Sequence, residues 1–222
     1  MVKKVLIALA GGVVVMVLGF LIYLSTGQYQ AKLFQEYQLV EENGTLIKLH
    51  DSDIGFIFYQ GGKVENDAYS YLSLVEANVF LLDTPFNLSI FSINQAQTII
   101  DKYPNIKTWY IGGHSLGGST AYLFANQTST PIAGIIYLGA YPTAVNSFRQ
   151  LAIFGSRDGL LDYQDYISYF DEADTVKVIE GGNHANFGEY GPQAGDNYST
   201  IGSLCQKTLT LEYINEFIGG NK

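Results

Sequence analysis

The sequence predicts an α/β protein in which helices cover both faces of a mostly parallel central sheet. From Gly44 onward, short runs rich in β-branched and aromatic residues alternate with longer amphipathic stretches, the order typical of such a sheet. Several of these runs, such as Ile135–Leu138, are apolar without interruption. Continuous apolar runs indicate strands that are buried on both faces, which favours this class over a β-sandwich.

The pattern predicts seven strands and five helices. The strands are Thr45–Leu49, Ile54–Tyr59, Asn78–Leu82, Thr108–Ile111, Ile132–Leu138, Leu151–Phe154 and Thr175–Ile179, and the helices are 66–77, 88–102, 116–127, 163–171 and 199–218. Only about a dozen residues separate Leu138 from Leu151, so no large cap domain is expected there.

The N-terminus is expected to form a membrane anchor. Lys3 and Lys4 precede Val5–Leu24, twenty residues without a charge. As a helix this run would span about 30 Å, the thickness of the hydrocarbon core of a bilayer. Because basic residues favour the cytoplasmic side, the single-pass chain is expected to have a cytoplasmic N-terminus and an extracellular remainder. The alternatives are a cleaved signal peptide with an exit site at Ser25–Gly27, which gives a secreted form, and a buried helix of the fold.

Length and composition limit the remaining organisation and the partners. Residues 1–27 are assigned to the anchor, 28–43 to a connector and 44–222 to one folded domain. The net charge of −9, with twelve Lys and Arg, argues against a nucleic-acid partner. Cys205 is the one cysteine, so no disulfide can form within the chain, and the three histidines lack the spacing of a zinc site. No metal is therefore expected, and none of the functions considered below requires a cofactor.

The clearest chemical motif is Gly113-His114-Ser115-Leu116-Gly117, a GxSxG pattern between a predicted strand and a predicted helix. In this context the serine occupies a strained turn that lifts its hydroxyl above the sheet, and small flanking residues avoid collision with the strand and the helix. The helix N-terminus also favours an anionic intermediate. We therefore expect Ser115 to be a nucleophile; the alternative is a serine that only caps the helix.

A histidine and an acid are expected downstream, because this arrangement orders its triad Ser, Asp or Glu, then His. His184 is the one histidine after Ser115, and it follows a predicted strand in a glycine-rich loop. Asp158 follows another strand directly and is the preferred acid, with Asp162 in reserve. The acid would accept the imidazole N–H and stabilise the imidazolium. His114 is expected to pack beside the turn.

The oxyanion hole is expected at a double-glycine turn. Gln60-Gly61-Gly62-Lys63 follows the strand that ends at Tyr59. A backbone N–H of Gly61, Gly62 or Lys63 could bind the substrate oxygen together with the N–H of Leu116. The sequence does not choose among the three residues, and an ordinary turn is the alternative.

With the oxyanion turn, the nucleophile, the acid and the base in this order, the chain resembles the α/β-hydrolase superfamily over nearly all of residues 44–220. The segments that carry the closer resemblance are Phe58–Glu65, Pro85–Asn87, Gly112–Gly118 and Gly181–Ala185. They are similar to a small bacterial branch related to dienelactone hydrolases. The resemblance implies a carboxylic-ester hydrolase fold with a Ser-Asp-His triad. Because dienelactone hydrolases use cysteine and this chain has Ser115, a dienelactone substrate is not implied.

The expected substrate site is an open aromatic cleft. Without a large lid, loops that contain Phe86, Tyr141, Phe187 and Tyr190 are predicted to shape it. The favoured function is hydrolysis of small acyl esters through an acyl-enzyme intermediate. An acyltransferase or peptidase using the same triad, or a non-catalytic cell-surface binding module, are the alternatives. The sequence does not indicate the oligomeric state.

Overall fold

The structure is a computed structural model, and it describes residues 16, 18–20, 22, 24–33 and 35–220. Its centre is an eight-stranded sheet in the order β1-β2-β4-β3-β5-β6-β7-β8. The first two strands pair antiparallel, β2 is antiparallel to β4, and all other neighbours are parallel. The strands are β1 (Val40–Glu42), β2 (Thr45–Lys48), β3 (Ile54–Tyr59), β4 (Asn78–Leu82), β5 (Thr108–His114), β6 (Ile132–Leu138), β7 (Gln150–Gly155) and β8 (Thr175–Ile179).

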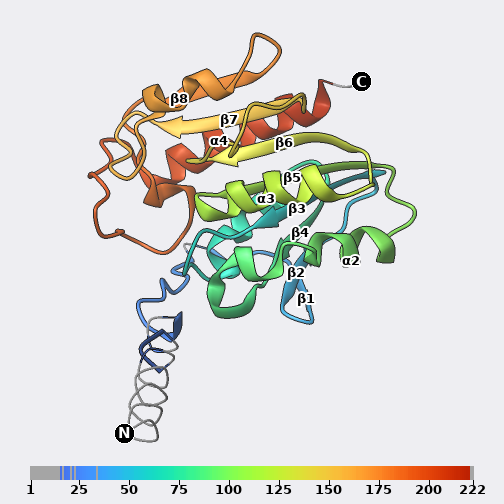
Figure 1. The fold of residues 1–222 in the computed structure, drawn as a ribbon, viewed down its shortest axis with the longest axis horizontal. Helices are drawn as coiled ribbons and strands as arrows, with labels where there is room; N and C mark the ends of the chain where they lie inside the picture. Colours follow the sequence, from blue (N-terminus) through green and yellow to red (C-terminus); the bar gives the residue numbers. More distant parts are fainter. Residues whose placement is uncertain (1–15, 17, 21, 23, 34, 221–222) are drawn as a thin grey trace, which may run out of the picture.

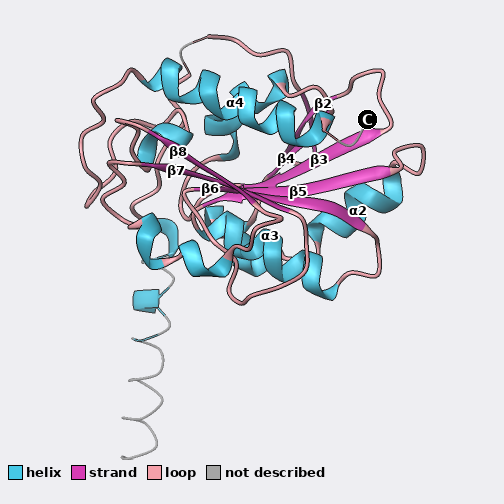
Figure 2. Cartoon of the chain, turned by 90° about the horizontal axis from the view of Figure 1, so that it is seen from above, coloured by secondary structure: helices cyan, strands magenta, loops and turns pink. Residues whose placement is uncertain are grey.

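Helices cover both faces of this sheet. Figure 2 shows α4 (Ser203–Gly219) on one face, with α2 (Gln95–Lys102) and α3 (Leu116–Gln127) on the other. Successive side chains of β3 point alternately to the two faces of the sheet, as in any β-strand. Phe56 and Phe58 belong to the core under α4, whereas Ile57 and Tyr59 belong to the core under α2 and α3. The expected fold class is confirmed for this part of the chain.

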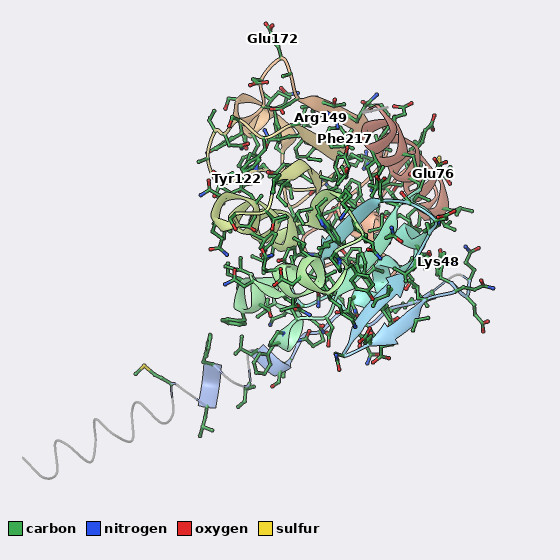
Figure 3. The ribbon with its side chains drawn as sticks, turned by 90° about the vertical axis from the view of Figure 1, so that its right-hand side faces the viewer. Lys48, Glu76, Tyr122, Arg149, Glu172 and Phe217 are labelled. Carbon is green, nitrogen blue, oxygen red and sulfur yellow. The ribbon has the colours of Figure 1, made fainter. Side chains whose placement is uncertain are left out.

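One cation–aromatic contact fixes α4 on the sheet. The guanidinium carbon of Arg149 lies 3.8 Å from the ring centroid of Phe217, and the two side chains are labelled together in Figure 3. Arg149 also donates to the backbone carbonyl of Phe217 at 2.8 Å. The helix is thereby held against the amino end of β7.

The predicted helices are the least accurate part of the sequence analysis. Segment 66–77 forms a 3₁₀ helix, η1 (Asn66–Leu74), and 163–171 forms two short 3₁₀ turns, η4 (Tyr163–Asp165) and η5 (Ile167–Tyr169). Segment 163–171 has no buried residue in either turn, so it lacks the packing that stabilises a longer helix. Segment 88–102 divides into η3 (Ser89–Ser92) and α2, and the final helix begins at Ser203.

Most of the predicted membrane segment Val5–Leu24 lies outside the described residues. Its described residues are helical, and Figure 1 shows that they project from the domain. Met16, Leu18, Phe20 and Ile22 are exposed, whereas Leu24 is buried. No helix within the described ranges has both the length and the apolar character needed to cross a membrane.

Candidate active site

Ser115 occupies a sharp turn between β5 and α3. Its φ of 53° and ψ of −120° are strained for a residue with a side chain. The turn closes tightly around its glycines: a Cβ on Gly113 would lie 2.2 Å from the carbonyl carbon of Gly117, and a Cβ on Gly117 would lie 2.1 Å from the carbonyl oxygen of Tyr59. Only glycine fits at these two positions, which is the geometry that the motif predicts.

His184 and Asp158 form a buried pair on neighbouring loops. Nδ1 of His184 lies 2.7 Å from Oδ2 of Asp158, and their side chains are 2% and 1% exposed. The other carboxylate oxygen, Oδ1, accepts the backbone N–H groups of Leu160 and Leu161, each at 2.9 Å. Both oxygens of the carboxylate are therefore hydrogen-bonded, and the carboxylate can hold the imidazole with its Nε2 directed elsewhere.

Nε2 of His184 is the atom that a general base would use on the serine. It is buried and has no hydrogen-bond partner among the described residues. Ser115 and His184 line the same cleft, which has a volume of about 310 Å³. Asp162, the reserve acid of the sequence analysis, instead accepts the N–H of Gln164 at 3.0 Å. The structure thus brings together Ser115, His184 and Asp158 from three separate segments.

The loops that carry the acid and the base are joined by backbone contacts. The N–H of Arg157 donates to the carbonyl of Gly182 at 2.8 Å. A second carboxylate, Asp196, receives the N–H groups of Gly159, His184 and Ala185 at 3.0, 3.3 and 2.8 Å. Asp196 was not predicted from the sequence, because its partners are backbone groups from two other loops.

Hydrogen bonding distinguishes the three candidate donors of the oxyanion turn. The N–H of Gly61 donates to the hydroxyl of Tyr69 at 3.0 Å, and the N–H of Lys63 donates to the carbonyl of Asn87 at 2.7 Å. Within the described residues, the N–H groups of Gly62 and Leu116 have no hydrogen-bond partner. Leu116 is the first residue of α3, where an N–H has no partner within the helix. Gly62 and Leu116 are therefore the available pair of donors.

A second histidine lies beneath the first. His114 is buried, its ring centroid is 4.5 Å from that of His184, and its Nδ1 lies 2.8 Å from the hydroxyl of Tyr69. Burial, and then the nearby His184, lower the pKa of His114 well below its usual value. His114 is therefore neutral and forms part of the floor under the base, which agrees with the packing role expected for it.

The cleft differs from the predicted pocket in all but one residue. Tyr141 lines it, whereas Phe187 and Tyr190 are buried in the core and Phe86 is exposed outside it. Phe187 and Tyr190 were wrongly predicted because both rings are buried in the core, where they contact His114 at the end of β5. The residues that line the cleft are Ser115, Leu116, Ser119, Gly139, Ala140, Tyr141, Leu160, Leu161, Tyr166 and His184.

Tyr141 and Tyr166 form one wall of this cleft. Their rings are stacked with centroids 3.5 Å apart and an interplanar angle of 12°. Hydrogen bonding to Tyr166, and then burial, raise the pKa of Tyr141 to about 12. Leu160 and Leu161 were not predicted as lining residues, although both closely follow Asp158 in the chain. In the part of the chain that the structure describes, no three His, Cys, Asp or Glu side chains are grouped so that they could hold a metal ion.

Comparisons with known proteins agree with this geometry at the level of the fold. The family model for the alpha/beta hydrolase family matches residues 55–208. An esterase from Pyrococcus furiosus is 15% identical, with a TM-score of 0.56 over 83% of this chain and 91% of that one. A thermophilic esterase from Thermogutta terrifontis, solved with propionate bound, is 14% identical, with a TM-score of 0.55 over 87% of this chain and 94% of that one.

A curated sequence relative matches a much smaller region. The methylenetetrahydrofolate–tRNA-(uracil-5-)-methyltransferase TrmFO of Koribacter versatilis is 31% identical over 83 residues. That region is 37% of this chain and 19% of the relative, so the chain spans about a fifth of the relative's length. This partial match shows neither a shared family nor a shared activity.

Proposed function

This chain belongs to the alpha/beta hydrolase family, and from that premise we propose that it is a serine hydrolase that cleaves small carboxylic esters. The observation that carries the proposal is the buried pair of His184 and Asp158 in the cleft that holds Ser115. Solved esterases of the same fold, from Pyrococcus furiosus and Thermogutta terrifontis, support the choice of substrate class.

In the proposed reaction, Oγ of Ser115 attacks the ester carbonyl while Nε2 of His184 takes its proton. Asp158 accepts the Nδ1–H and stabilises the imidazolium. The N–H groups of Gly62 and Leu116 bind the oxyanion as the tetrahedral intermediate forms. The imidazolium then protonates the alcohol as the ester bond breaks. Water, deprotonated by the same imidazole, then attacks the acyl-enzyme. The imidazolium returns the proton to Oγ of Ser115 as the acyl–oxygen bond breaks and the acid is released.

The neutral, partly apolar lining of the cleft favours uncharged acyl groups. Its lining contains no Asp, Glu, Lys or Arg side chain. Leu160, Leu161 and the stacked pair of Tyr141 and Tyr166 provide apolar contact. A charged acyl group would lose hydration there without gaining an ionic partner.

The test compares steady-state hydrolysis of p-nitrophenyl acetate and p-nitrophenyl butyrate by the parent and by Ser115→Ala. We expect the substitution to lower kcat by at least about a thousandfold, because it removes the nucleophile. Ser129→Ala is the matched control, since Ser129 is an exposed serine in the turn after α3, and its kcat should stay within about twofold of the parent. If Ser115→Ala retains the parent rate, the proposed mechanism is wrong.

The proposal includes attachment to a membrane through the N-terminal segment. Support comes from the uncharged run Val5–Leu24 and from the exposure of its described residues Met16, Leu18, Phe20 and Ile22. With Lys3 and Lys4 in the cytoplasm, the catalytic domain would face the cell exterior. The full chain should float with phospholipid vesicles in a density gradient, and a chain beginning at Gln28 should not. Flotation of neither would contradict the anchor.

A further inference from the structure

Three large apolar side chains form an exposed patch beside the N-terminal segment. Phe86, Ile90 and Phe91 are 47%, 39% and 51% exposed, and they belong to η2 (Pro85–Asn87) and η3. The rings of Phe86 and Phe91 lie 6.5 Å apart. Phe86 also adopts a φ of 58°, which is costly for a bulky residue. The fold therefore keeps a phenylalanine in water at a conformational cost, and we call these three residues the apolar patch.

The apolar patch lies where the N-terminal run reaches the domain. Nε2 of Gln28 donates to the carbonyl of Leu24 at 2.7 Å and to the carbonyl of Phe86 at 3.2 Å. Nδ2 of Asn87 in turn donates to Oε1 of Gln28 at 3.0 Å. One side chain thus holds together the last residue of the uncharged run and the first residue of the patch.

The same region borders the oxyanion turn. The N–H of Lys63 donates to the carbonyl of Asn87 at 2.7 Å. A Cβ on Gly62 would lie 3.4 Å from the Leu116 side chain and 3.7 Å from the side chain of Leu88, which stands between Phe86 and Ile90 in the chain. Leu88 and Gly62 therefore lie between the patch and Leu116, which lines the cleft of Ser115.

We propose that the apolar patch rests in the surface of the membrane beside the opening of the active site, and that the enzyme acts on esters dissolved in that lipid. The inference rests on the proposed function and makes it more specific. Its occupant is a lipid surface because the uncharged run, twenty residues long, ends against the patch itself. An interfacial position transfers the aromatic side chains out of water and shortens the path of an apolar ester to Ser115.

The position of the patch is tested by fluorescence of the full chain in phosphatidylcholine–phosphatidylglycerol vesicles that contain bromine-labelled lipid, which quenches nearby tryptophan. The native tryptophan, Trp109, is buried and gives the background signal. Phe91→Trp should be quenched by at least about twofold more than the parent. The control is Leu49→Trp, an exposed apolar position that follows β2 at the amino end of β4. Figure 3 shows its neighbour Lys48 far from the N-terminal segment.

The consequence for catalysis is tested with two substrates on the same vesicles. Combining Phe86→Asn with Phe91→Ser should lower hydrolysis of methylumbelliferyl oleate dissolved in the bilayer by about fivefold, because the polar residues leave the interface. Hydrolysis of water-soluble p-nitrophenyl acetate should stay within about twofold. Asparagine suits the left-handed backbone at position 86, so folding is spared. Leu49→Ser should change neither rate.

The quenching and hydrolysis measurements distinguish failure of this inference from failure of the proposed function. Quenching of Phe91→Trp no greater than that of Leu49→Trp would overturn the interfacial position, whatever the activity. Equal loss of both activities in the combined variant, or loss of neither, would overturn lipid delivery. Absence of p-nitrophenyl acetate hydrolysis in the parent would instead reject the proposed function and leave the quenching result as an independent test of the patch.

Discussion

Asp196 is the residue whose role the structure adds to the proposed triad. Its carboxylate receives the N–H groups of His184 and Ala185 on the base loop and that of Gly159 on the acid loop. Those partners lie 12, 11 and 37 positions away in the chain. A charged acceptor shared by two loops fixes their separation more firmly than neutral hydrogen bonds would. Asp196 is therefore a positioning residue for the pair of His184 and Asp158.

We predict that Asp196→Ala lowers kcat for p-nitrophenyl acetate by about tenfold, with KM within about twofold, because the base is misplaced while the cleft is retained. A tenfold loss corresponds to about 1.4 kcal/mol, the scale of hydrogen bonds to a charged group. Asp162→Ala removes an exposed carboxylate that caps only a local turn and should leave kcat unchanged. Asp196→Asn, which keeps one acceptor oxygen, should recover part of the rate. An unchanged kcat in Asp196→Ala would contradict the positioning role.

The sequence identifies functional residues when their signal is local. Ser115 was predicted from its flanking glycines, and His184 and Asp158 from chain order and from strands that end just before them. Asp196 has no such signal, because its backbone partners are set only by the way the loops return. Gly62 likewise could not be chosen over Gly61 and Lys63 until Tyr69 and Asn87 were seen to occupy the other two N–H groups.

At the scale of elements, the turn between β5 and α3 is the most tightly constrained feature. Gly117 faces the carbonyl oxygens of Tyr59 and Gln60 at the end of β3, at 2.1 and 2.6 Å from an added Cβ. Those are backbone atoms, which cannot move aside as a flexible side chain could. The close approach of α3 to β3 therefore places Leu116 beside Gly62, and the oxyanion site depends on it.

We predict that Gly117→Ala destabilises the protein by about 3 kcal/mol or more, or prevents folding, because helix and strand must separate. Gly219→Ala is the matched control: it lies in the last turn of α4 with no atom within 4 Å of an added Cβ. That change should be neutral or stabilise by up to about 1 kcal/mol. Urea unfolding of both variants measures the difference in stability. Equal unfolding midpoints would contradict the claim that only glycine fits at position 117.

Strands were easier to predict than helices, for a physical reason. A buried parallel strand is a continuous apolar run, so six of the seven predicted strands match the observed elements within two residues, and β5 extends three residues further to His114. In segment 163–171, Tyr163 and Phe170 pack against Phe154 of β7 and are only partly buried. Neither 3₁₀ turn of the segment contains a buried residue, so tertiary packing does not extend them into a longer helix. β1 was not predicted because its three residues are all exposed and only one of them, Val40, is apolar.

At the scale of the whole molecule, the connector is part of the folded domain. Tyr29 pairs with Val64 in an isolated bridge, and the hydroxyl of Tyr37 donates to Glu189 at 3.1 Å. Glu189 also lies 3.6 Å from Lys207 of α4, with both side chains buried. Segment 28–43, expected to be only a connector, thus braces the oxyanion turn and the loop after His184. A chain that begins at residue 44 would lack these contacts with the oxyanion turn and with the loop after His184.

The proposed function depends above all on an activated serine at position 115. The most direct measurement treats the full chain and its Ser115→Ala variant with a fluorophosphonate and follows covalent addition by intact mass. We predict one adduct on the parent and none on the variant, since in the proposed mechanism His184 and Asp158 activate Ser115 alone. A folded parent that stays unlabelled, or a variant labelled as fast as the parent, would contradict it.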